Sequence, residues 1–420
     1  MLKAAIQAGG IGSRLAEYYP DLPKPMIPLN GKPLLQHQVE ALVGQGFAEI
    51  TLIVGYKADI IKEHFGDGAG FGAKISYITE HSPLGTGGAL ALLPKEDTLL
   101  LFGDVYCDVD FQRFVEYHQT KKAAITLFVH PNSHPHDSDI VITADDGRVL
   151  AWASKKDRQR GDLRNLVNAG LYVFAGSALP SGAAEKCDLE HDIITARLDD
   201  SKVYAYRSSE YVKDMGTPER LAQVENDIKS GIASARSLQR KQKAVFIDRD
   251  GTINVFSDLV TKPQQLGLLD GAAEAIRLLN QSEYLAICVT NQPIIARGDV
   301  TFAELTAIHA RLDTLLGEQG AYLDDLIFCP HHPDRGFAGE RRELKIDCNC
   351  RKPKPGMLLK AAKRYNIDLT QSYMIGDSDR DIGAGQAAGC GTVGIGEASG
   401  FSVAADMYCD SLLAAVRQIR

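Results

Sequence analysis

Two aspartates separated by one residue follow a short apolar stretch in the second half of the chain. Val245–Ile247 precede Asp248, and Asp250 comes two positions later. A carboxylate can attack a phosphate ester and form an acyl phosphate, which divides a very slow hydrolysis into two steps. A second acid nearby can protonate the leaving oxygen and then activate water. Taken alone, the pair is equally compatible with an ordinary metal site or a turn.

Three later motifs supply the other groups that such a reaction needs. In chain order they are Thr290 and Asn291 at the end of a predicted strand, Arg351 with Lys352, and an acidic run from Asp377 to Asp381. Together with the aspartate pair, these motifs resemble those of the haloacid-dehalogenase-like (HAD-like) phosphatases over about residues 243–420.

This resemblance implies a role for each residue. Asp248 would be the nucleophile, and Asp250 the general acid and base. Mg²⁺ would be held by Asp248, Asp250 and Asp377. Asp381 would support the site without binding the metal itself. The residues that would bind the phosphoryl group and the substrate are Thr290, Asn291, Arg351 and Lys352.

Four soft metal ligands lie between these motifs in two closely spaced pairs. Their types predict a tetrahedral zinc site formed by Cys329, His331, Cys348 and Cys350. Protein would fill all four positions, so we expect the Zn²⁺ to be structural. His332 is a competing ligand, and reduced thiols that merely lie close together are the plainer alternative. The pattern resembles a phosphatase subgroup that acts on heptose bisphosphates or histidinol phosphate, from which Pro293-Ile294 is a departure.

A glycine-rich turn, Gly9 to Leu15, follows the first apolar strand, and Pro23-Lys24-Pro25 comes soon after. Such a turn lets backbone N–H groups approach phosphate oxygens, although close packing of a helix on a strand uses the same residues. When one phosphate attacks another, cations and Mg²⁺ must offset the repulsion. Asp104 and Asp214 are candidate metal ligands, or else a turn former and a helix cap.

These motifs resemble the sugar-phosphate nucleotidyltransferases over about residues 1–230. By this resemblance Arg14 and Lys24 would neutralise phosphates in the reaction, and Asp104 and Asp214 would bind Mg²⁺. The residues implied to contact the triphosphate, base or sugar phosphate are Gly9, Gly10, Gly12, Glu80, Gly85, Lys155 and Asn168. Ser154 replaces the glutamate that usually precedes the lysine, and Gln7 replaces an aliphatic residue beside the base.

The elements that must position these groups alternate between strands and helices, which is typical of α/β domains. The predicted strands are 4–8, 50–55, 75–79, 98–102, 124–129, 169–174, 203–206, 244–248 and 285–289, with others near 140, 149 and 375. A helix is predicted over 218–229, and Ser230–Ser237 indicates a linker or a helix extension. We expect two Rossmann-like domains: residues 1–237 with a mixed GT-A-like sheet, and residues 238–420 with a parallel sheet lacking a large cap.

The composition limits the kinds of molecule that the protein is expected to bind. The chain of 420 residues has a net charge of −8, which argues against nucleic acid and membrane surfaces. No apolar run approaches the roughly 20 residues that span a bilayer. The eight cysteines lack the spacing of a disulfide framework, and the start is unlike a signal peptide, so we expect a cytoplasmic protein. Any oligomer is expected to involve the N-terminal half.

The two resemblances are chemically complementary. A 7-phosphatase acting on D-glycero-D-manno-heptose 1,7-bisphosphate leaves a 1-phosphate that a nucleotidyltransferase can use. We therefore expect a bifunctional enzyme with Mg²⁺ in both halves that uses sugar phosphates and a nucleoside triphosphate. The first half most resembles the heptose-1-phosphate guanylyltransferases, and this resemblance implies GTP as the triphosphate and GDP-heptose as the product. The alternatives are another sugar phosphate, another triphosphate (UTP, CTP or ATP), or one half that is not catalytic.

Overall fold

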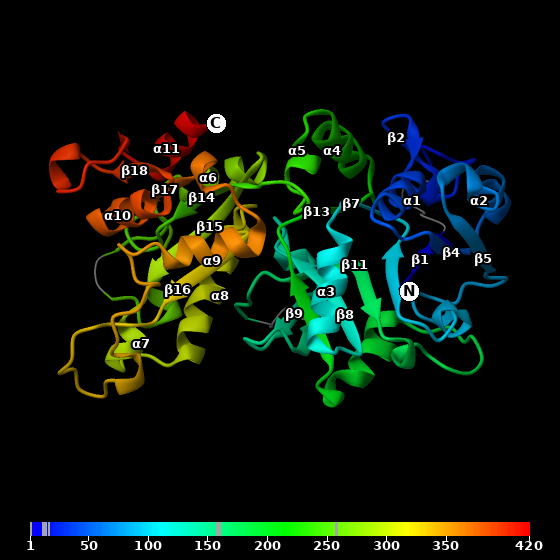
Figure 1. The fold of residues 1–420 in the computed structure, drawn as a ribbon, viewed down its shortest axis with the longest axis horizontal. Coiled ribbons are helices and arrows are strands. Elements are labelled where there is room, and N and C mark those ends of the chain that lie inside the picture. Colours follow the sequence, from blue (N-terminus) through cyan, green and yellow to red (C-terminus); the bar gives the residue numbers. More distant parts are fainter. Residues whose placement is uncertain (1, 11–14, 16, 157–160, 257–258) are drawn as a thin grey trace. The chain divides into compact units, whose positions relative to one another are not determined.

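The computed structural model describes residues 2–10, 15, 17–156, 161–256 and 259–420 (Figure 1). Tertiary contacts divide the chain into two compact units. The first comprises Met1–Val129, Val141–Trp152 and Asn168–Ser237, and the second comprises His130–Ile140, Ala153–Val167 and Leu238–Arg420. The last passage between the units falls at residue 237. Two segments that we expected in the first domain, 130–140 and 153–167, group with the second unit.

A mixed sheet forms the centre of the first unit, as its alternating pattern predicts. The strand order is β10-β9-β11-β6-β1-β4-β5, with β8 pairing β11 and β12. Strands β1, β4, β5 and β6 are mutually parallel, whereas β11 runs antiparallel to β6. The bounds are β1 (Lys3–Gln7), β4 (Glu49–Val54), β5 (Lys74–Thr79), β6 (Thr98–Phe102), β8 (Ile125–His130), β9 (Ile140–Thr143), β10 (Val149–Ala153), β11 (Val167–Phe174) and β12 (Val203–Arg207).

Helices and two short ribbons complete the first unit. Apolar residues of α1, α2 and α3 pack on the strands in one core, because each helix has an apolar stripe. The helices are α1 (Leu34–Gly44), α2 (Ala58–Phe65), α3 (Phe111–Lys121), α4 (Pro218–Lys229) and α5 (Ile232–Ala235). The ribbons are β2 (Pro28–Leu29) with β3 (Lys32–Pro33), and β7 (Val105–Asp108) with β13 (Tyr211–Asp214).

The expected linker, Ser230–Ser237, is a folded part of the first unit. Helix α4 ends at Lys229, as predicted, and Gly231 reverses the chain with a φ of +81°. The following turn of helix, α5, buries Ala233 against Leu221 of α4. A small side chain permits this close packing, which the small and polar composition of the run did not distinguish from a linker.

A six-stranded parallel sheet forms the second unit, in the order β16-β15-β14-β17-β18-β19. Its strands are β14 (Lys243–Ile247), β15 (Tyr284–Asn291), β16 (Asp325–Cys329), β17 (Tyr373–Gly376), β18 (Gly391–Ile395) and β19 (Met407–Cys409). Its helices are α6 (Ala272–Asn280), α7 (Ile294–Arg297), α8 (Phe302–Glu318), α9 (Gly356–Tyr365), α10 (Asp379–Ala388) and α11 (Leu412–Ile419).

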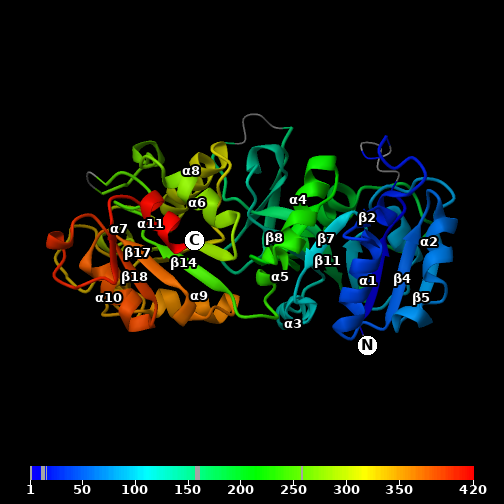
Figure 2. The same ribbon diagram turned by 90° about the horizontal axis from the view of Figure 1, so that it is seen from above.

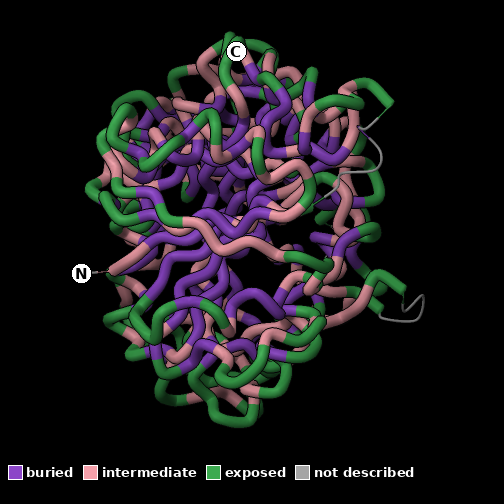
Figure 3. The backbone as a smooth tube through the Cα atoms, turned by 90° about the vertical axis from the view of Figure 1, so that its right-hand side faces the viewer, coloured by how far each residue is buried: buried purple, intermediate pink, exposed green. Residues whose placement is uncertain are grey.

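Both faces of this parallel sheet are covered. Val245 and Ile247 of β14 pack with α6, α8 and α11, whereas Ala244 and Phe246 pack with α9 and α10. Successive side chains of a strand point to opposite faces, so a strand buried on both sides is continuously apolar. Figure 2 shows α9 and α10 on one side of the sheet and α6 and α8 on the other. In Figure 3 the buried residues (purple) lie mainly in the interior and the exposed residues (green) at the periphery.

The parallel strands bring polar groups to one edge of each sheet. Asp248 follows β14, Thr290 lies near the end of β15, and Asp377 follows β17. Gly9 follows β1 in the first unit. The carboxyl ends of neighbouring parallel strands meet at the same edge, where α/β proteins bind ligands. Among the described residues, no helix combines the length and the apolar character that crossing a membrane requires.

Candidate active sites and a candidate metal centre

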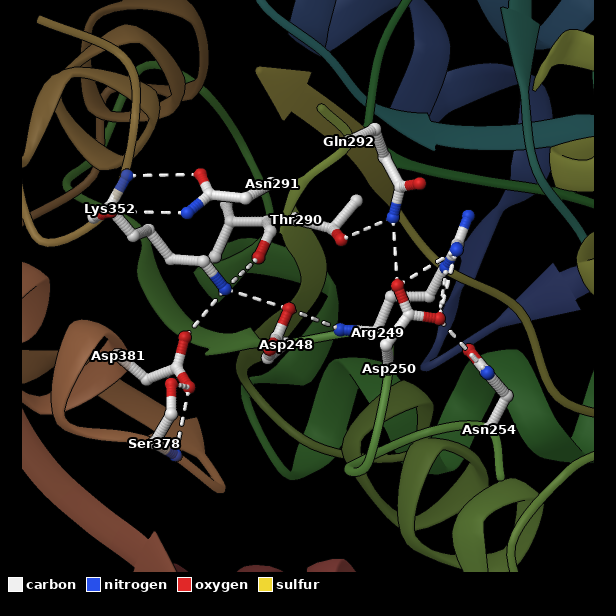
Figure 4. A network of polar contacts seen from close by, with 11 residues as sticks. Asp248, Arg249, Asp250, Asn254, Thr290, Asn291, Gln292, Lys352, Ser378 and Asp381 are labelled. Carbon is white, nitrogen blue, oxygen red and sulfur yellow. Dashed lines mark hydrogen bonds and ion pairs between the residues drawn. The ribbon is translucent and has the colours of Figure 1, made fainter. Parts of the chain in front are cut away.

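Three carboxylates converge at the carboxyl edge of the second sheet. Oxygens of Asp248, Asp377 and Asp381 lie within 4.8 Å of one another. The ammonium of Lys352, only 2% exposed, lies 2.7 Å from Asp248 Oδ1 and 2.6 Å from Asp381 Oδ1. It also donates a hydrogen bond to the Val289 carbonyl of β15 at 2.8 Å (Figure 4). One buried cation therefore faces three acids.

The excess of negative charge changes the protonation of the cluster. Burial and then the charge of Asp381 raise the pKa of Asp248 to about 7, although Lys352 opposes the shift. Burial and Asp381 also raise the pKa of Asp377. The pKa of Lys352 is raised despite its burial, because Asp248 and Asp381 favour the ammonium. Converging carboxylate oxygens with unbalanced charge fit a hard divalent cation such as Mg²⁺.

Asp250 lies outside this cluster, contrary to the expectation that its carboxylate binds Mg²⁺. The guanidinium of Arg249, 1% exposed, donates to Asp250 through Nε at 3.0 Å and Nη2 at 2.8 Å. Asn254 Nδ2 donates to the same carboxylate at 3.1 Å. Asp381, expected to support the site, pairs through Oδ1 with Lys352 and through Oδ2 with the Ser378 hydroxyl, and it also has an oxygen within 4.8 Å of those of Asp248 and Asp377. These contacts are visible in Figure 4.

Gln292 is a site residue that the sequence analysis missed. Its Nε2 donates to Asp250 Oδ2 at 2.8 Å and to Thr290 Oγ1 at 2.9 Å. One buried amide therefore links the candidate acid–base residue to the candidate phosphate-binding hydroxyl. Its place two residues after Thr290 was the available signal. Asn291 has a different partner, because its side chain pairs with the backbone N–H and carbonyl of Lys352.

Gly251 must be glycine for two reasons. Its φ is +84°, in the left-handed region that disfavours other residues. A Cβ at this position would also collide with the carboxylate of Asp377. The turn after Asp250 therefore allows Asp377 to approach the cluster.

The predicted metal ligands come together at the end of β16, which supplies Cys329, and in the loop that follows it. Cys329, His331, Cys348 and Cys350 form one group, with neighbouring ligand atoms 3.2–3.6 Å apart. Ligands around a tetrahedral zinc ion, bound at about 2.0–2.3 Å, would lie about 3.5–3.8 Å apart. The hydrogen bond between Cys350 and Cys329, opposed by burial, lowers the pKa of Cys350 to about 5. The group therefore has the donors, spacing and thiolate that zinc requires.

The second histidine has other partners. His332 Nδ1 accepts a hydrogen bond from the Asp334 N–H, and its Nε2 lies 3.4 Å from Arg297 Nη2. His331 is therefore the histidine that joins the three cysteines, as the family resemblance implied. Arg351 joins this loop to the phosphate-binding motif, since its Nη1 donates to the His331 carbonyl at 3.3 Å.

Part of the candidate transferase site lies beside the ribbon of β7 and β13. Lys24 Nζ forms an ion pair with Asp104 Oδ2 at 2.7 Å. Asp214 pairs with Val105 across the antiparallel ribbon, and the Met215 N–H donates to the Asp104 carbonyl at 2.9 Å. The structure thus brings both candidate metal ligands to one end of the ribbon. An ion pair with Arg220, opposed by burial, lowers the pKa of Asp214.

The predicted glycine turns lie close to candidate contact residues. A Cβ on Gly9 would collide with the carboxylate of Glu80, which explains the need for glycine there. Gln7 Nε2 donates to the Gly85 carbonyl at 3.0 Å, so the residue that departs from the family pattern contacts the predicted base-binding turn. Gly10 is described, with open space around it. Gly12 and Arg14 lie outside the described residues.

Asn168 has a partner that the sequence did not indicate. Its Nδ2 donates to the Tyr172 hydroxyl at 2.5 Å and also to the carboxylate of Glu190. Glu190 is distant in sequence, and no local motif indicated it. Lys155 groups with the second unit, where its backbone N–H donates to Asp139 Oδ1 at 2.7 Å.

We expect the Cys/His group to bind zinc and to stabilise its unit. The unaltered chain should contain about one zinc ion, and Cys350→Ser should lose it. Structural zinc can contribute roughly 10–16 kcal/mol in small domains, so the melting temperature should fall by about 5 °C or more. Elemental analysis and thermal unfolding measure both effects. Cys409→Ser, outside the group, should keep its zinc; equal zinc in both variants would rule out this site.

Removing the buried charge of Asp248 should stabilise the metal-free protein. Because the folded pKa is raised, the penalty begins above the ordinary value near 3.8 and is complete above about pH 7. At pH 8 in EDTA, Asp248→Asn should gain on the order of 1 kcal/mol, or about 2–4 °C in melting temperature. Mg²⁺ should reduce the difference by stabilising the unaltered chain. Exposed Asp410→Asn is the control; a destabilised Asp248→Asn protein would contradict the charge argument.

Comparison with known proteins assigns each half to a family. Residues 3–231 match the family model described as nucleotidyl transferase, and residues 349–412 match the model described as HAD-hydrolase-like. Mannose-1-phosphate guanylyltransferase of Mycobacterium tuberculosis is 33% identical over 245 residues, covering 56% of this chain and 67% of that protein.

Relatives of the second half carry a phosphatase name. D-glycero-beta-D-manno-heptose-1,7-bisphosphate 7-phosphatase of Yersinia pestis is 42% identical over 149 residues, covering 36% of this chain and 77% of that protein. A solved D,D-heptose 1,7-bisphosphate phosphatase from B. bronchiseptica, complexed with magnesium and phosphate, is 34% identical with a TM-score of 0.38. It covers 42% of this chain and 98% of that one. The chain belongs to the nucleotidyl transferase family through its first half and to the HAD-like phosphatases through its second, and is a bifunctional enzyme of these two classes.

Proposed function

We propose that this enzyme makes a nucleotide-activated heptose in two steps. It removes the 7-phosphate from D-glycero-D-manno-heptose 1,7-bisphosphate, and then transfers GMP from GTP to the remaining 1-phosphate with release of pyrophosphate. The observation that carries the proposal is the chemical match between the halves, since the phosphatase product retains the phosphate that a nucleotidyltransferase uses. The names of the 42% identical 7-phosphatase and the 33% identical guanylyltransferase support the sugar and the base, respectively.

In the phosphatase reaction, Asp248 is proposed as the nucleophile. Its carboxylate oxygen bonds to phosphorus while the bond to O7 breaks, and Asp250 supplies the proton that O7 takes. Water then attacks the acyl phosphate with Asp250 accepting its proton, which releases phosphate and restores Asp248. Lys352 and the Thr290 hydroxyl bind the phosphoryl oxygens. Mg²⁺, held by Asp248, Asp377 and Asp381, would offset the charge of the phosphoryl group.

The neighbours of Asp248 and Asp250 support this division of roles. Lys352 lies against Asp248, where a cation lowers the energy of a carboxylate meeting an anionic substrate. Arg249 and Gln292 donate hydrogen bonds to the carboxylate of Asp250 and fix its position. Gln292 also donates to the Thr290 hydroxyl, so it connects the two residues. Asp250 is held apart from the three-acid cluster, which separates its proposed role in proton transfer from metal binding.

In the transferase reaction, an oxygen of the sugar 1-phosphate attacks the α-phosphorus and pyrophosphate leaves. Lys24 and Arg14 are proposed to neutralise the phosphates, and Asp104 and Asp214 to hold Mg²⁺. The ion pair of Lys24 with Asp104 supports this assignment, because a triphosphate with its metal can take over both partners. The glycine turn from Gly9, with Glu80 and Gly85, is proposed to receive the nucleotide, and Asn168 and Lys155 the sugar phosphate.

Substitutions at two aspartates should separate the activities. Asp248→Asn should lower phosphatase turnover by roughly 10³-fold or more, because the nucleophile is lost. Asp104→Asn should lower nucleotidyl transfer by roughly 10²-fold or more, because a metal ligand worth several kcal/mol is lost. Each variant should keep the other activity within about twofold. Phosphate and pyrophosphate release, assayed separately, measure the effects; a variant that retains its own reaction would refute the assignment for that half.

The substrate is tested with the unaltered enzyme, Mg²⁺ and both anomers of heptose 1,7-bisphosphate, offering GTP, ATP, UTP and CTP in turn. We expect phosphate release without a nucleotide, and GDP-heptose only with GTP. Mannose 1-phosphate is offered in parallel, because the 33% identical relative is named for it. Efficient formation of GDP-mannose without GDP-heptose would show that mannose 1-phosphate, and not heptose 1-phosphate, is the substrate of the transfer step. Absence of phosphate release, with histidinol phosphate also tested, would reject the 7-phosphatase assignment and direct attention to Pro293-Ile294.

A further inference from the structure

Helix α8 of the phosphatase half is buried on two faces. Ile308, Leu312 and Leu316 pack in the core beneath the sheet. Ala310, Asp313 and Gly317 are also buried, and their spacing of three and four residues places them along a second face of the helix. A helix that covers one side of a sheet normally turns its other face to water. The second face, with small residues and a carboxylate, therefore has its own packing partner.

That partner is a part of the transferase half of the sequence. Residues 130–140 and 153–167 form one compact unit with residues 238–420. The carboxylate of Asp313, 6% exposed, accepts hydrogen bonds from Arg164 Nε at 2.7 Å and from the Asn165 N–H at 3.0 Å. A Cβ on Gly317 would lie 2.5 Å from Pro135 Cγ, so the segment 130–140 also contacts the helix closely.

A series of hydrogen bonds leads from Asp313 through residues of both segments, 130–140 and 153–167. Asn165, 4% exposed, pairs with Asn132 through two hydrogen bonds, of 2.7 and 3.2 Å. Asn132 Nδ2 donates to Ser138 Oγ at 2.9 Å, and the next residue, Asp139, accepts from the Lys155 N–H at 2.7 Å. The bond from Asn165 to Asp313 is buried and those of Asn132 are partly buried, so they are costly to leave unmade, whereas the last bond, from Lys155 to Asp139, is exposed.

We propose that Asp313 is a positioning residue for nucleotidyl transfer, acting through Asn165, Asn132 and Asp139 on the backbone of Lys155. Helix α8 thereby influences the backbone conformation at Lys155 within the second unit. The inference rests on the proposed role of Lys155 in binding the sugar 1-phosphate. It assigns to α8 a role in the second reaction, in addition to covering the sheet of the first.

The test compares Asp313→Ala with Lys155→Ala in the full chain, using the sugar 1-phosphate that the unaltered enzyme turns over. Both variants should raise KM for that substrate about tenfold, with KM for GTP and phosphatase kcat/KM within twofold of the unaltered values. Asp313→Asn retains an acceptor for the Asn165 N–H and should recover part of the loss. Gly317→Ala, which displaces Pro135 from the same face, should also raise this KM.

Asp406→Asn is the matched control, since Asp406 also accepts two hydrogen bonds, but from Thr392 on β18. It should leave both KM values unchanged. An unchanged sugar 1-phosphate KM in Asp313→Ala, with Lys155→Ala impaired, would overturn the positioning role and leave the proposed function standing. If Lys155→Ala is itself unimpaired, the assigned role of Lys155 is wrong, and the positioning role is rejected with it. A lower melting temperature together with equal losses of both activities would show that Asp313 is only structural.

Discussion

The buried ammonium of Lys352 is the interaction on which the phosphatase site depends. Parallel strands bring Asp248 and Asp377 to one edge, and the start of α10 adds Asp381. Such a group of carboxylates is costly to bury unless a cation compensates it. Lys352 pairs with two of the acids and is itself held by the Val289 carbonyl of β15. The pairing leaves negative charge in excess, which would suit a divalent cation.

Residues next to strand ends were predictable because their positions follow from the fold class alone. An acid after β14 and an acid after β17 must lie close together, since the two strands are parallel neighbours. The four metal ligands were predictable for a related reason, because residue type and pair spacing constrain them strongly. The strands for which ranges were predicted agree with the structure to within about two residues, whereas β16, β18 and β19 of the second sheet were not predicted.

The direction of individual side chains was not predictable. Asp250 was expected to join the metal cluster, but the buried guanidinium of Arg249 and the amide of Gln292 hold its carboxylate elsewhere. Asp381 joins the cluster because it lies in the first turn of α10, where its other oxygen accepts from the Ser378 hydroxyl. These choices depend on contacts between separate motifs, whereas spacing within one motif leaves them open. The same is true of Glu190, which contacts Asn168 across 22 residues of sequence.

Residues 130–140 and 153–167 group with the second unit for a physical reason that the sequence contained but did not make decisive. Residues 130–140 and 153–167 adjoin strands of the first sheet, so their local pattern is that of the first domain. The contrary signal lay in α8, where Ala310, Asp313 and Gly317 interrupt the polar face expected of a surface helix. A buried carboxylate on that face requires a donor, and Arg164 and the Asn165 N–H provide it. The chain thus passes between the two units several times, and cutting it at residue 237 would leave Asp313 and Asn165 without each other.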